Sequence, residues 1–265
     1  METIKSRANQ NVKRARNVSK GKEPDFFFVE GKRLFDDLLA SPIMPESVYV
    51  SVRFAERHPD QTESLAQRFQ NFFLLTNGVF DSIADTKTPQ GVAAVCRVPG
   101  NGRQRIEEGL TDCSTGVVVL LHGVSNPGNL GAVLRSAEAF GAAGAIITPG
   151  SAAPFSAASL RGSMGSAFRV PVWSGAGFKA AIDWSEKLGL ASVCADRGAE
   201  APLRDADLNR RILFVLGSEG HGISEKDRSL VAEQYCIPTE GDVESLNLSV
   251  AAGILLYEAA SRRRS

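Results

Sequence analysis

The sequence predicts a two-domain α/β protein in which a small α/β sandwich precedes a doubly wound parallel sheet. Over residues 23–98, strand-like runs alternate with helix-length segments, which is typical of an α/β unit. Beyond residue 116 come six apolar runs rich in Val, Ile and Leu, as expected of parallel strands covered on both faces. Residues 99–116 break both patterns with Gly, Pro and charged residues, and this composition predicts a linker.

In the first domain, hydrophobic spacing predicts each element in turn. Residues 26–31 read as a strand, and Leu34, Leu38 and Leu39 mark a helix that Ser41 and Pro42 end. The elements expected after it are a strand at 47–54, a helix at 62–70, a strand at 71–76, a short helix at 80–85 and a strand at 91–98. A unit of this size can fold by itself.

The second domain is expected to span residues 117–265. Its strands are predicted at residues 117–121, 145–148, 168–173, 190–195, 212–216 and 235–238. Pro238 closes the last run because proline cannot donate to a sheet ladder.

Composition excludes several classes of protein. The chain has 265 residues, is 43% hydrophobic and carries no formal net charge, so it can bury a substantial core. Residues 1–22 do not resemble a signal peptide, and no apolar run approaches the roughly 18 residues of a membrane span. The four cysteines are scattered without metal-ligand spacing. We therefore expect a cytoplasmic protein with no membrane partner and no metal.

Charge is unevenly distributed. Residues 1–22 hold seven cations against Glu2 alone, namely Lys5, Arg7, Lys13, Arg14, Arg16, Lys20 and Lys22. A basic arm on a neutral body is typical of a protein that binds a polyanion. A solvated, frayed terminus explains the same composition, and the sequence leaves both interpretations open.

Three junctions between predicted strands and helices carry polar and glycine residues. In the first, residues 122–136, Asn129 is a natural N-cap and Leu130, Leu134 and Ala137 form the buried stripe of a helix. Arg135 lies off that stripe, where its guanidinium could grip a phosphate. A surface cation is the alternative interpretation for Arg135.

The second junction follows the strand at 212–216 and reads Leu216, Gly217, Ser218, Glu219, Gly220, His221 and Gly222. Its glycines would let a ligand approach the backbone closely. The spacing is neither that of a dinucleotide-binding loop nor that of a P-loop, and His221 reads as a loop histidine.

The third junction follows the last strand, where residues 239–247 are dense in polar residues and Ser245 and Asn247 can cap an apolar helix at residues 246–260. In open α/β sheets such junctions meet in one crevice, where free N–H groups and helix N-termini attract ligands. An ordinary strand-to-helix connection is the alternative.

The segments NPGNLGAVLR, LGSEGHGIS and IPTEGDVESLNLSVA, in this order, closely resemble the three motifs of the SpoU (TrmH-like) RNA 2′-O-ribose methyltransferases of the SPOUT class. The resemblance covers residues 115–265 and implies a parallel-sheet domain with a deep C-terminal trefoil knot. Residues 23–98 resemble, by pattern, the L30e-like substrate-binding domain that many ribosomal-RNA members carry. The family's cofactor is S-adenosyl-L-methionine (AdoMet), and its members act on RNA as homodimers.

Carried over by motif position, the resemblance implies catalytic roles for Asn129, Arg135, Glu219, Ser245 and Asn247. It places cofactor contacts at Leu216, Gly217, Gly220, Ile237 and Leu246. The candidate RNA-binding residues are the cations Lys13, Arg14, Arg16, Lys32, Arg33 and Arg161. Around Arg161, substrate contact and simple packing are equally compatible with the small residues nearby.

The implied reaction is attack of a ribose hydroxyl on a sulfonium methyl group, most often in 23S ribosomal RNA for members with such an N-terminal domain. Catalysis then consists of alignment and removal of one proton. The family assigns the base to the arginine that matches Arg135, but an arginine side chain almost never deprotonates, so a clamp on the neighbouring phosphate is the other role open to it. The alternatives in function are a tRNA 2′-O-methyltransferase and a non-catalytic RNA-binding protein with the same fold.

Overall fold

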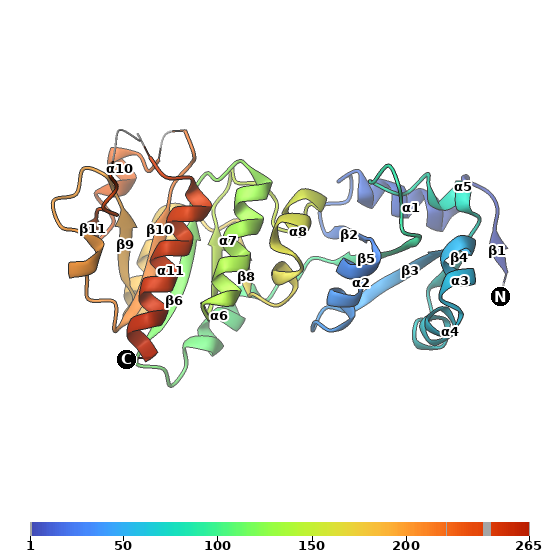
Figure 1. The fold of residues 1–265 in the computed structure, drawn as a ribbon, viewed down its shortest axis with the longest axis horizontal. Helices are drawn as coiled ribbons and strands as arrows, with labels where there is room; N and C mark the ends of the chain where they lie inside the picture. Colours follow the sequence, from blue (N-terminus) through green and yellow to red (C-terminus); the bar gives the residue numbers. More distant parts are fainter. Residues whose placement is uncertain (1, 221, 241–244, 265) are drawn as a thin grey trace. The chain divides into compact units, whose positions relative to one another are not determined.

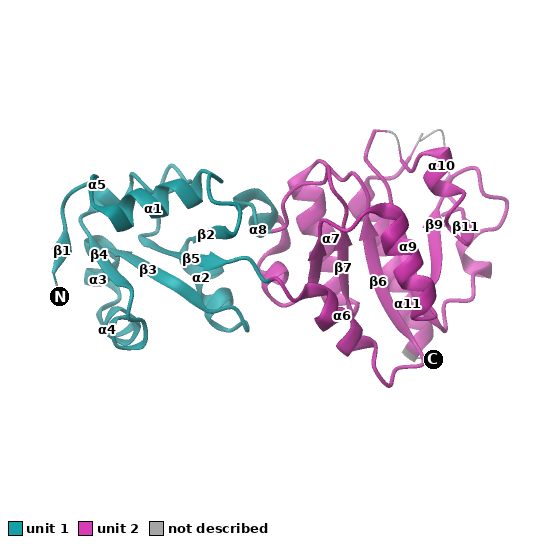
Figure 2. Cartoon of the chain, turned by 180° about the vertical axis from the view of Figure 1, so that it is seen from behind, with its two compact units in different colours: residues 1–99, 155–161 teal, residues 100–154, 162–265 magenta. Residues whose placement is uncertain are grey.

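The computed structural model describes residues 2–220, 222–240 and 245–264 (Figure 1). His221 and residues 241–244, which belong to the second and third motifs, lie outside the described residues. The chain forms two compact units (Figure 2). Unit 1 comprises Met1–Pro99 and Phe155–Arg161, and unit 2 comprises Gly100–Pro154 and Gly162–Ser265.

The described part of unit 1 contains a five-stranded mixed sheet in the order β1-β4-β3-β5-β2. The strands are β1 (Thr3–Ile4), β2 (Phe26–Glu30), β3 (Pro45–Ser51), β4 (Phe72–Leu75) and β5 (Val92–Arg97). β4 runs parallel to β1 and β3, whereas β5 is antiparallel to β3 and β2. The expected strand at 47–54 therefore ends early, because the Ser51 side chain accepts a hydrogen bond from the Phe54 amide and caps a helix instead.

Helices cover this sheet. They are α1 (Gln10–Ser19), α2 (Lys32–Leu39), α3 (Val52–Arg57), α4 (Pro59–Arg68), α5 (Asn77–Phe80) and most of α8 (Ala157–Ser163). α8 groups with unit 1 although residues 117–265 were expected to form one domain. Phe155, just before it, stacks on Phe27 of β2 with ring centroids 4.7 Å apart, and Arg161 lies 2.9 Å from Asp85.

The N-terminal segment is part of unit 1, which corrects the prediction of a separate basic arm at residues 1–22. α1 buries Val12, Ala15 and Val18, three residues apart on one face, in the same core cluster as Tyr49 of β3. The sequence did not show this because the cations between these positions dominate the composition. The apolar stripe that docks the helix is small and interrupted.

The described part of unit 2 contains a six-stranded sheet in the order β11-β9-β10-β6-β7-β8, and every pairing is parallel. Its strands are β6 (Gly116–Leu121), β7 (Gly144–Ile147), β8 (Val172–Ser174), β9 (Ala191–Ala195), β10 (Arg211–Leu216) and β11 (Glu233–Tyr235). The chain winds outward from β6 to β8 and then crosses to β9, so the direction of winding reverses between β6 and β10. The predicted parallel α/β sheet is confirmed.

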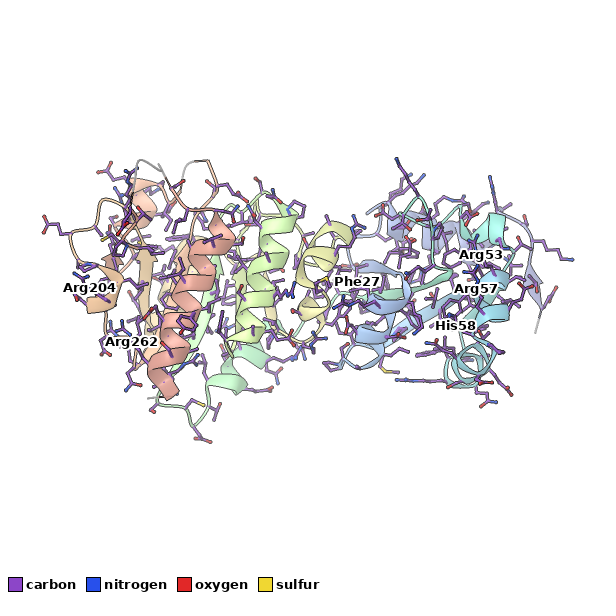
Figure 3. The ribbon with its side chains drawn as sticks, in the orientation of Figure 1. Phe27, Arg53, Arg57, His58, Arg204 and Arg262 are labelled. Carbon is purple, nitrogen blue, oxygen red and sulfur yellow. The ribbon has the colours of Figure 1, made fainter. Side chains whose placement is uncertain are left out.

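Helices lie on both faces of this sheet. They are α6 (Gly102–Leu110), α7 (Pro127–Ala139), α9 (Phe178–Lys187), α10 (Glu225–Arg228) and α11 (Leu248–Arg264), with short 3₁₀ turns η1 (Ser166–Phe168) and η2 (Leu203–Asp205). α7 and α11 pack side by side on the face seen in Figure 1. α6 and α9 bury their apolar side chains against the other face. The end of α11 is held by Arg262, which donates to the Arg204 carbonyl at 3.0 Å (Figure 3).

The stretch at 99–116, expected to be a linker, instead contains α6. Ile106 and Leu110 of this helix are buried in the core of unit 2. A Cβ added at Gly102 would lie 1.8 Å from the Val172 carbonyl oxygen, so the helix touches β8 directly. The glycine that suggested a loop is there because nothing larger fits.

Two expected strands shift at their ends. Phe168, the first residue of the run predicted at 168–173, ends η1 (Ser166–Phe168), and β8 begins only at Val172. The last strand ends at Tyr235 rather than running to Pro238, because the Cys236 amide donates to Ala201 and pairs the chain with a loop. Apolar runs show where a strand lies but not where its ladder of hydrogen bonds stops.

Candidate active site

The first two junctions meet where the winding of the sheet reverses. β6 and β10 are hydrogen-bonded neighbours whose last residues, Leu121 and Leu216, stand opposite each other. The two loops that follow them therefore leave the same edge of the sheet side by side. In open parallel sheets this edge is where ligands bind.

Asn126, not Asn129, caps α7. Its side chain accepts hydrogen bonds from the amides of Gly128 at 2.8 Å and Asn129 at 3.3 Å, with Pro127 as the first helical residue. The expectation that Asn129 is the N-cap was wrong, because the helix begins one turn earlier. Because Asn126 supplies the cap, the Asn129 side chain is available for other contacts.

Asn129 links the three motifs by side-chain hydrogen bonds. Its Nδ2 donates to Glu219 Oε1 at 3.1 Å, and its Oδ1 accepts from Asn247 Nδ2 at 3.3 Å. The same Glu219 oxygen accepts from the Asn126 amide at 3.3 Å. Residues 90 and 118 positions apart in the sequence thus form one polar cluster, which we call the Asn129–Glu219–Asn247 cluster.

The environment of Glu219 favours its charged form. Partial burial raises the pKa of this carboxyl, but hydrogen bonds from the Asn129 side chain and from the amides of Glu219, Asn126 and Ser125 outweigh it and leave the pKa below its ordinary value. Glu219 is therefore a carboxylate at neutral pH and serves as a hydrogen-bond acceptor, not as a proton donor.

Asn247 also begins α11. Its Oδ1 accepts from the Ser249 amide at 2.9 Å and from the Ser249 hydroxyl at 2.6 Å, so the predicted capping role is confirmed. The helix, expected at residues 246–260, extends through Leu248–Arg264 and buries Ala252, Leu255 and Leu256. One residue therefore both starts the last helix and joins the polar cluster.

The glycines of the second loop form a tight turn. Ser218 and Gly222 exchange backbone hydrogen bonds of 3.0 and 2.9 Å, and Gly222 has a φ of +62°. A Cβ on Gly217 would lie 2.3 Å from the Gly222 carbonyl carbon, so close approach of the chain to itself requires Gly217. At Gly220 an added Cβ would meet nothing within 4 Å, which leaves open space beside this residue.

A hollow opens at the carboxyl ends of β9 and β11 and the start of α11. It is lined by Ala195, Asp196, Arg197, Ile237, Thr239, Ser245, Leu246 and Ala251. Of the residues predicted for the cofactor and the reaction, Ile237, Ser245 and Leu246 line it. Leu216 is instead buried in the sheet, where its carbonyl accepts from the His122 amide.

Asp196, Arg197 and Thr239 are lining residues that the sequence did not single out. Asp196 comes directly after β9, so its place at the end of a predicted strand was the available signal. Burial raises the pKa of Asp196, but its bonds from Arg228 and from the Gly198 amide hold the pKa below the ordinary value. The hollow thus has an apolar wall with one carboxylate at its rim.

Arg135 stands apart from this arrangement. It is exposed on α7 and has no hydrogen-bond or ion-pair partner among the described residues. The predicted stripe of Leu130, Leu134 and Ala137 is buried on the opposite side of the same helix. Within unit 2, Arg135 is available for a ligand but is not joined to the Asn129–Glu219–Asn247 cluster.

Most of the cations predicted to bind RNA are engaged within unit 1. Arg14 pairs with Glu46 at 2.5 Å, Arg16 donates to Ser82, Lys32 pairs with Asp36 at 2.6 Å and Arg161 pairs with Asp85. Lys13 and Arg33 are exposed, with no partner among the described residues.

A basic hollow on unit 1 was not anticipated from the sequence. It is lined by Arg53, Arg57, Asp81, Thr86, Lys87, Thr88, Pro89 and Gln90, and Figure 3 shows Arg53 and Arg57 together on α3. Asp81 lies 3.6 Å from Arg53, whereas Arg57 and Lys87 have no partner among the described residues. Arg53 and Arg57 lie four positions apart on α3, but Lys87 is 30 positions further along the chain, so no local pattern marked the three together.

Residues 116–257 match the model of the SpoU rRNA Methylase family, and residues 2–94 match that of the MRM3-like substrate binding domain. The chain belongs to the SpoU rRNA methylase family. Members of this family are RNA 2′-O-ribose methyltransferases, so the resemblance drawn from the three motifs is confirmed. The second match starts at residue 2, which agrees with α1 being part of unit 1.

Similar proteins cover nearly the whole chain. The 23S rRNA (guanosine(2553)-2′-O)-methyltransferase RlmP of Bacillus subtilis (strain 168) is 30% identical over 97% of this chain and 98% of its own length. An uncharacterized tRNA/rRNA methyltransferase of Mycobacterium ulcerans (strain Agy99) is 39% identical, but the match spans 58% of this chain and 50% of that protein.

Among solved structures, one of an RNA 2′-O ribose methyltransferase is 28% identical, with a TM-score of 0.76 and 99% of both chains covered. The SpoU methyltransferase AviRb of Streptomyces viridochromogenes, solved in complex with AdoMet, has a TM-score of 0.83 at 24% identity and covers 97% of this chain and 99% of its own, so it shares the fold.

The described residues contain no candidate membrane span and no candidate metal cluster. None of their helices is long and apolar enough to cross a membrane. None of their His, Cys, Asp and Glu side chains gather in threes as a metal ion would need.

Proposed function

We propose that this chain uses AdoMet to methylate a ribose 2′-hydroxyl in 23S ribosomal RNA. The observation that carries the proposal is the Asn129–Glu219–Asn247 cluster, which unites residues of three separate motifs beside the hollow lined by Ile237, Ser245 and Leu246. Family membership supports the reaction, and the Bacillus subtilis relative, aligned over nearly its whole length, supports ribosomal RNA as the substrate.

The residues of the hollow fit the cofactor. Ala195, Ile237, Leu246 and Ala251 form an apolar wall suited to a nucleoside base, and Asp196 supplies a negative charge for a cationic ligand. The open space beside Gly220 leaves the backbone of the second loop accessible. When bound here, AdoMet supplies an electrophilic methyl group on a sulfonium. We assign Leu216, Gly217, Gly220, Ile237 and Leu246 to its binding, Leu216 through its backbone.

The Asn129–Glu219–Asn247 cluster holds side chains in position and takes no part in proton transfer. Glu219 is ionised and accepts hydrogen bonds, so it holds Asn129 in one orientation, and Asn129 in turn holds Asn247 at the start of α11. The two loops and the last helix keep a fixed relation through these bonds. Such preorganisation is how an enzyme places a hydroxyl for in-line attack. We assign Ser245, exposed next to the cluster, to the same region of the substrate.

Arg135 is proposed to clamp the phosphate beside the target ribose. A guanidinium stays protonated and binds phosphate through two parallel hydrogen bonds, which suits an exposed arginine better than the role of base. In a pH–rate profile, an Arg135→Lys variant is expected to lose rate at every pH. The lysine ammonium keeps the positive charge but lacks the two parallel N–H donors of the guanidinium. A variant with nearly full rate would contradict both roles.

The finer features of the fold remain proposals from the resemblance. We propose that the C-terminal chain of unit 2, after β11, forms a deep trefoil knot and that unit 1 is L30e-like. The domain boundaries are proposed to follow the two units, with residues 117–265 supplying most of the methyltransferase domain. We propose a cytoplasmic protein that needs no metal, because alignment and one proton transfer suffice for the reaction.

We also propose a homodimer. Val250 and Tyr257 on α11 are 49% and 57% exposed, which is unusual for large apolar side chains on a well-packed helix. Light scattering is expected to give twice the mass of one chain, and Tyr257→Glu is expected to give a monomer. Met44→Glu is the matched control, because Met44 is 61% exposed on unit 1. A monomeric wild-type protein would contradict the dimer.

RNA binding is assigned to unit 1. Arg53, Arg57 and Lys87 converge on one hollow with the Thr86 and Thr88 hydroxyls, and this combination suits the phosphates of a folded RNA. Lys13 and Arg33 remain candidates because they are exposed and have no partner in the part of the chain that the structure describes. Arg14, Arg16, Lys32 and Arg161 are less suited, since RNA would have to displace their present partners.

The proposal is tested with the purified full-length chain. Titration calorimetry should show AdoMet binding, and incubation with AdoMet should produce a 2′-O-methylnucleoside in 23S-derived transcripts, detected by mass spectrometry after nuclease digestion. Transfer RNA and 16S-derived transcripts serve as parallel substrates. Methylation of transfer RNA alone would replace the substrate we propose. Absence of AdoMet binding would leave a non-catalytic RNA-binding protein and end the proposal.

A further inference from the structure

α10 is a single turn of helix that directly follows the glycine turn of the second loop. Ser224 begins it: the Ser224 hydroxyl accepts from the Asp227 amide at 3.1 Å and donates to Asp227 Oδ2 at 2.7 Å. The turn before it has glycine at positions 217, 220 and 222, which offer no side chain to hold the loop in place. Glu219 holds this loop to Asn129 and the Asn126 amide, and α10 provides a second set of anchors.

Asp227 ties α10 to the end of β6. Its Oδ2 lies 3.4 Å from Nε2 of His122, the residue that follows β6. The other ring nitrogen of His122 lies 3.1 Å from the Thr148 hydroxyl, and the ring packs on Phe178 with centroids 4.6 Å apart. Asp227 is the only charged side chain that these contacts bring to the ring among the described residues. His122 is thus held from three elements and faces a carboxylate on a fourth.

Arg228 ties the same turn to the end of β9. Its Nη1 donates to Asp196 Oδ2, and Asp196 Oδ1 accepts from the Gly198 amide at 2.7 Å. Asp196 lines the hollow assigned to the cofactor. Consecutive residues of α10 therefore hold the ends of β6 and β9, the two strands that flank β10.

We propose that α10 is a clasp, in which the His122–Asp227 and Asp196–Arg228 pairs fix residues 217–220 and 222–224 of the second loop against the cofactor hollow. His122 and Arg228 are then positioning residues for AdoMet binding. The inference rests on the proposed function. A loop already held in its bound shape loses less conformational entropy when a ligand arrives, so the clasp strengthens binding without touching the ligand.

The size of the expected effects separates this role from a contribution to folding. Side chains in both pairs are 19–38% exposed, and pairs of this kind add little to global stability. The loop they hold has few other anchors, so removing either pair should weaken ligand binding. Ligand affinity should therefore change more than the unfolding transition.

The test compares clasp variants with a control on the same turn. His122→Ala and Arg228→Ala should each weaken AdoMet binding about three- to tenfold in titration calorimetry, with thermal unfolding of the free protein nearly unchanged. Lys226→Ala is the matched control, because Lys226 directly precedes Asp227 on α10 and its side chain has no partner among the described residues. It should bind AdoMet like the wild type.

Two further measurements distinguish a positioning role from a loss of affinity caused by a destabilised fold. Exchanging the pair, with His122→Asp and Asp227→His together, should restore part of the affinity lost in either single variant. In steady-state assays with saturating RNA and varied AdoMet, Arg228→Lys and His122→Gln should raise the KM for AdoMet and leave kcat within about twofold, since neither residue touches the reacting atoms.

The outcomes are separable. If wild type binds AdoMet and the His122 and Arg228 variants bind equally well, the clasp is wrong and the proposed function stands. If the variants lose affinity only in proportion to a large fall in unfolding temperature, the pairs are structural and the clasp is again wrong. If the wild-type chain binds no AdoMet, the clasp and the proposed function fail together.

Discussion

At the scale of single residues, the site depends on which of two neighbouring asparagines caps α7 and which one forms the polar cluster. Asn126 and Asn129 are both amides near the start of α7, yet only Asn126 caps the helix. Pro127 decides between them, because proline suits the first helical position and places the cap just before itself. Asn129 is then free to bridge Glu219 and Asn247. A catalytic assignment based on residue type alone cannot make this distinction.

Removing Glu219 should lower the methylation rate with little effect on the fold. Glu219→Ala takes away the acceptor for Asn129 Nδ2 and the Asn126 amide, and hydrogen bonds to a charged group are worth about 1.5–3 kcal/mol, so kcat should fall about 10- to 100-fold. Glu219→Gln keeps an acceptor oxygen and should fall less. Single-turnover kinetics provide the measurement, with Glu186→Gln on α9 as the control. An unchanged rate in Glu219→Ala would remove the cluster from the mechanism.

The Glu219 interaction should also survive mild acid. Its pKa is below the ordinary glutamate value in the folded chain, so its contribution to the cluster is complete above the unfolded-state pKa and is lost only as the pH falls through the depressed folded value. The carboxyl resonance of Glu219, followed by NMR, should titrate below that of an unstructured peptide. A midpoint at or above the peptide value would contradict the hydrogen-bond network.

Thiol reactivity should follow burial. Cys113 is exposed, whereas Cys96 and Cys194 are buried and burial raises the pKa of Cys194 to about 11. Mass spectrometry after brief treatment with iodoacetamide at pH 8 should find Cys113 modified and the two buried thiols unmodified until denaturant is added. Early modification of Cys194 would mean that β9 is not part of the sheet core.

At the scale of elements, α6 shows how composition can mislead. A segment rich in glycine and charge is typical of a linker, but here its two apolar side chains, Ile106 and Leu110, dock into the core and Gly102 lets the helix approach β8. α1 is a similar case, since its cations surround a narrow buried stripe. Both helices gain their stability from the sheet they cover rather than from their own sequence.

Two glycines two positions apart provide a test of this docking. Gly102→Ala would force a methyl group into the Val172 carbonyl, and overpacking of this kind costs about 1–3 kcal/mol. At Gly100 an added Cβ meets nothing within 4 Å, so Gly100→Ala should be neutral. Denaturant unfolding followed by Trp fluorescence measures the difference. Equal midpoints for the two variants would show that α6 does not contact β8 in solution.

At the scale of the whole molecule, a chain with no net charge must bind a polyanion through local concentration of cations. Residues 1–22 carry that concentration in the sequence, but intramolecular partners engage Arg14 and Arg16. Arg57 and Lys87, distant in the sequence and without a partner within residues 2–220, 222–240 and 245–264, meet in the basic hollow of unit 1. Folding therefore moves the expected RNA contact away from the most basic segment.

RNA affinity should reveal which cations matter. The double variant Arg57→Ala with Lys87→Ala removes two proposed phosphate contacts, so the slope of log affinity against log salt should become shallower by about 1.5. Lys20→Ala with Lys22→Ala removes the same charge from exposed positions of the N-terminal segment and should change the slope less. Filter binding of a 23S-derived transcript across a salt series gives the slopes. Equal changes would favour diffuse attraction over a defined hollow.

The features that depend only on residues close together in the chain could be predicted from the sequence alone. Hydrophobic runs of four to six residues predicted β6, β7, β9 and β10, the predicted buried stripe of α7 was correct, and the three motifs identified the family. These properties depend on hydrophobic periodicity and capping within a few residues, which the chain displays in order. The carboxyl ends of the strands were therefore expected as the site.

Which residues meet at the carboxyl edge of the unit 2 sheet depends on the tertiary structure. The bonds of Asn129 to Glu219 and Asn247 span 90 and 118 positions, and they exist because β10 inserts between β6 and β9 in the sheet. Asp196 at the rim of the hollow, the engagement of Arg14 and the docking of α6 depend on the same packing. Contacts between distant segments follow from strand order and from how closely side chains pack, and neither is visible in local spacing.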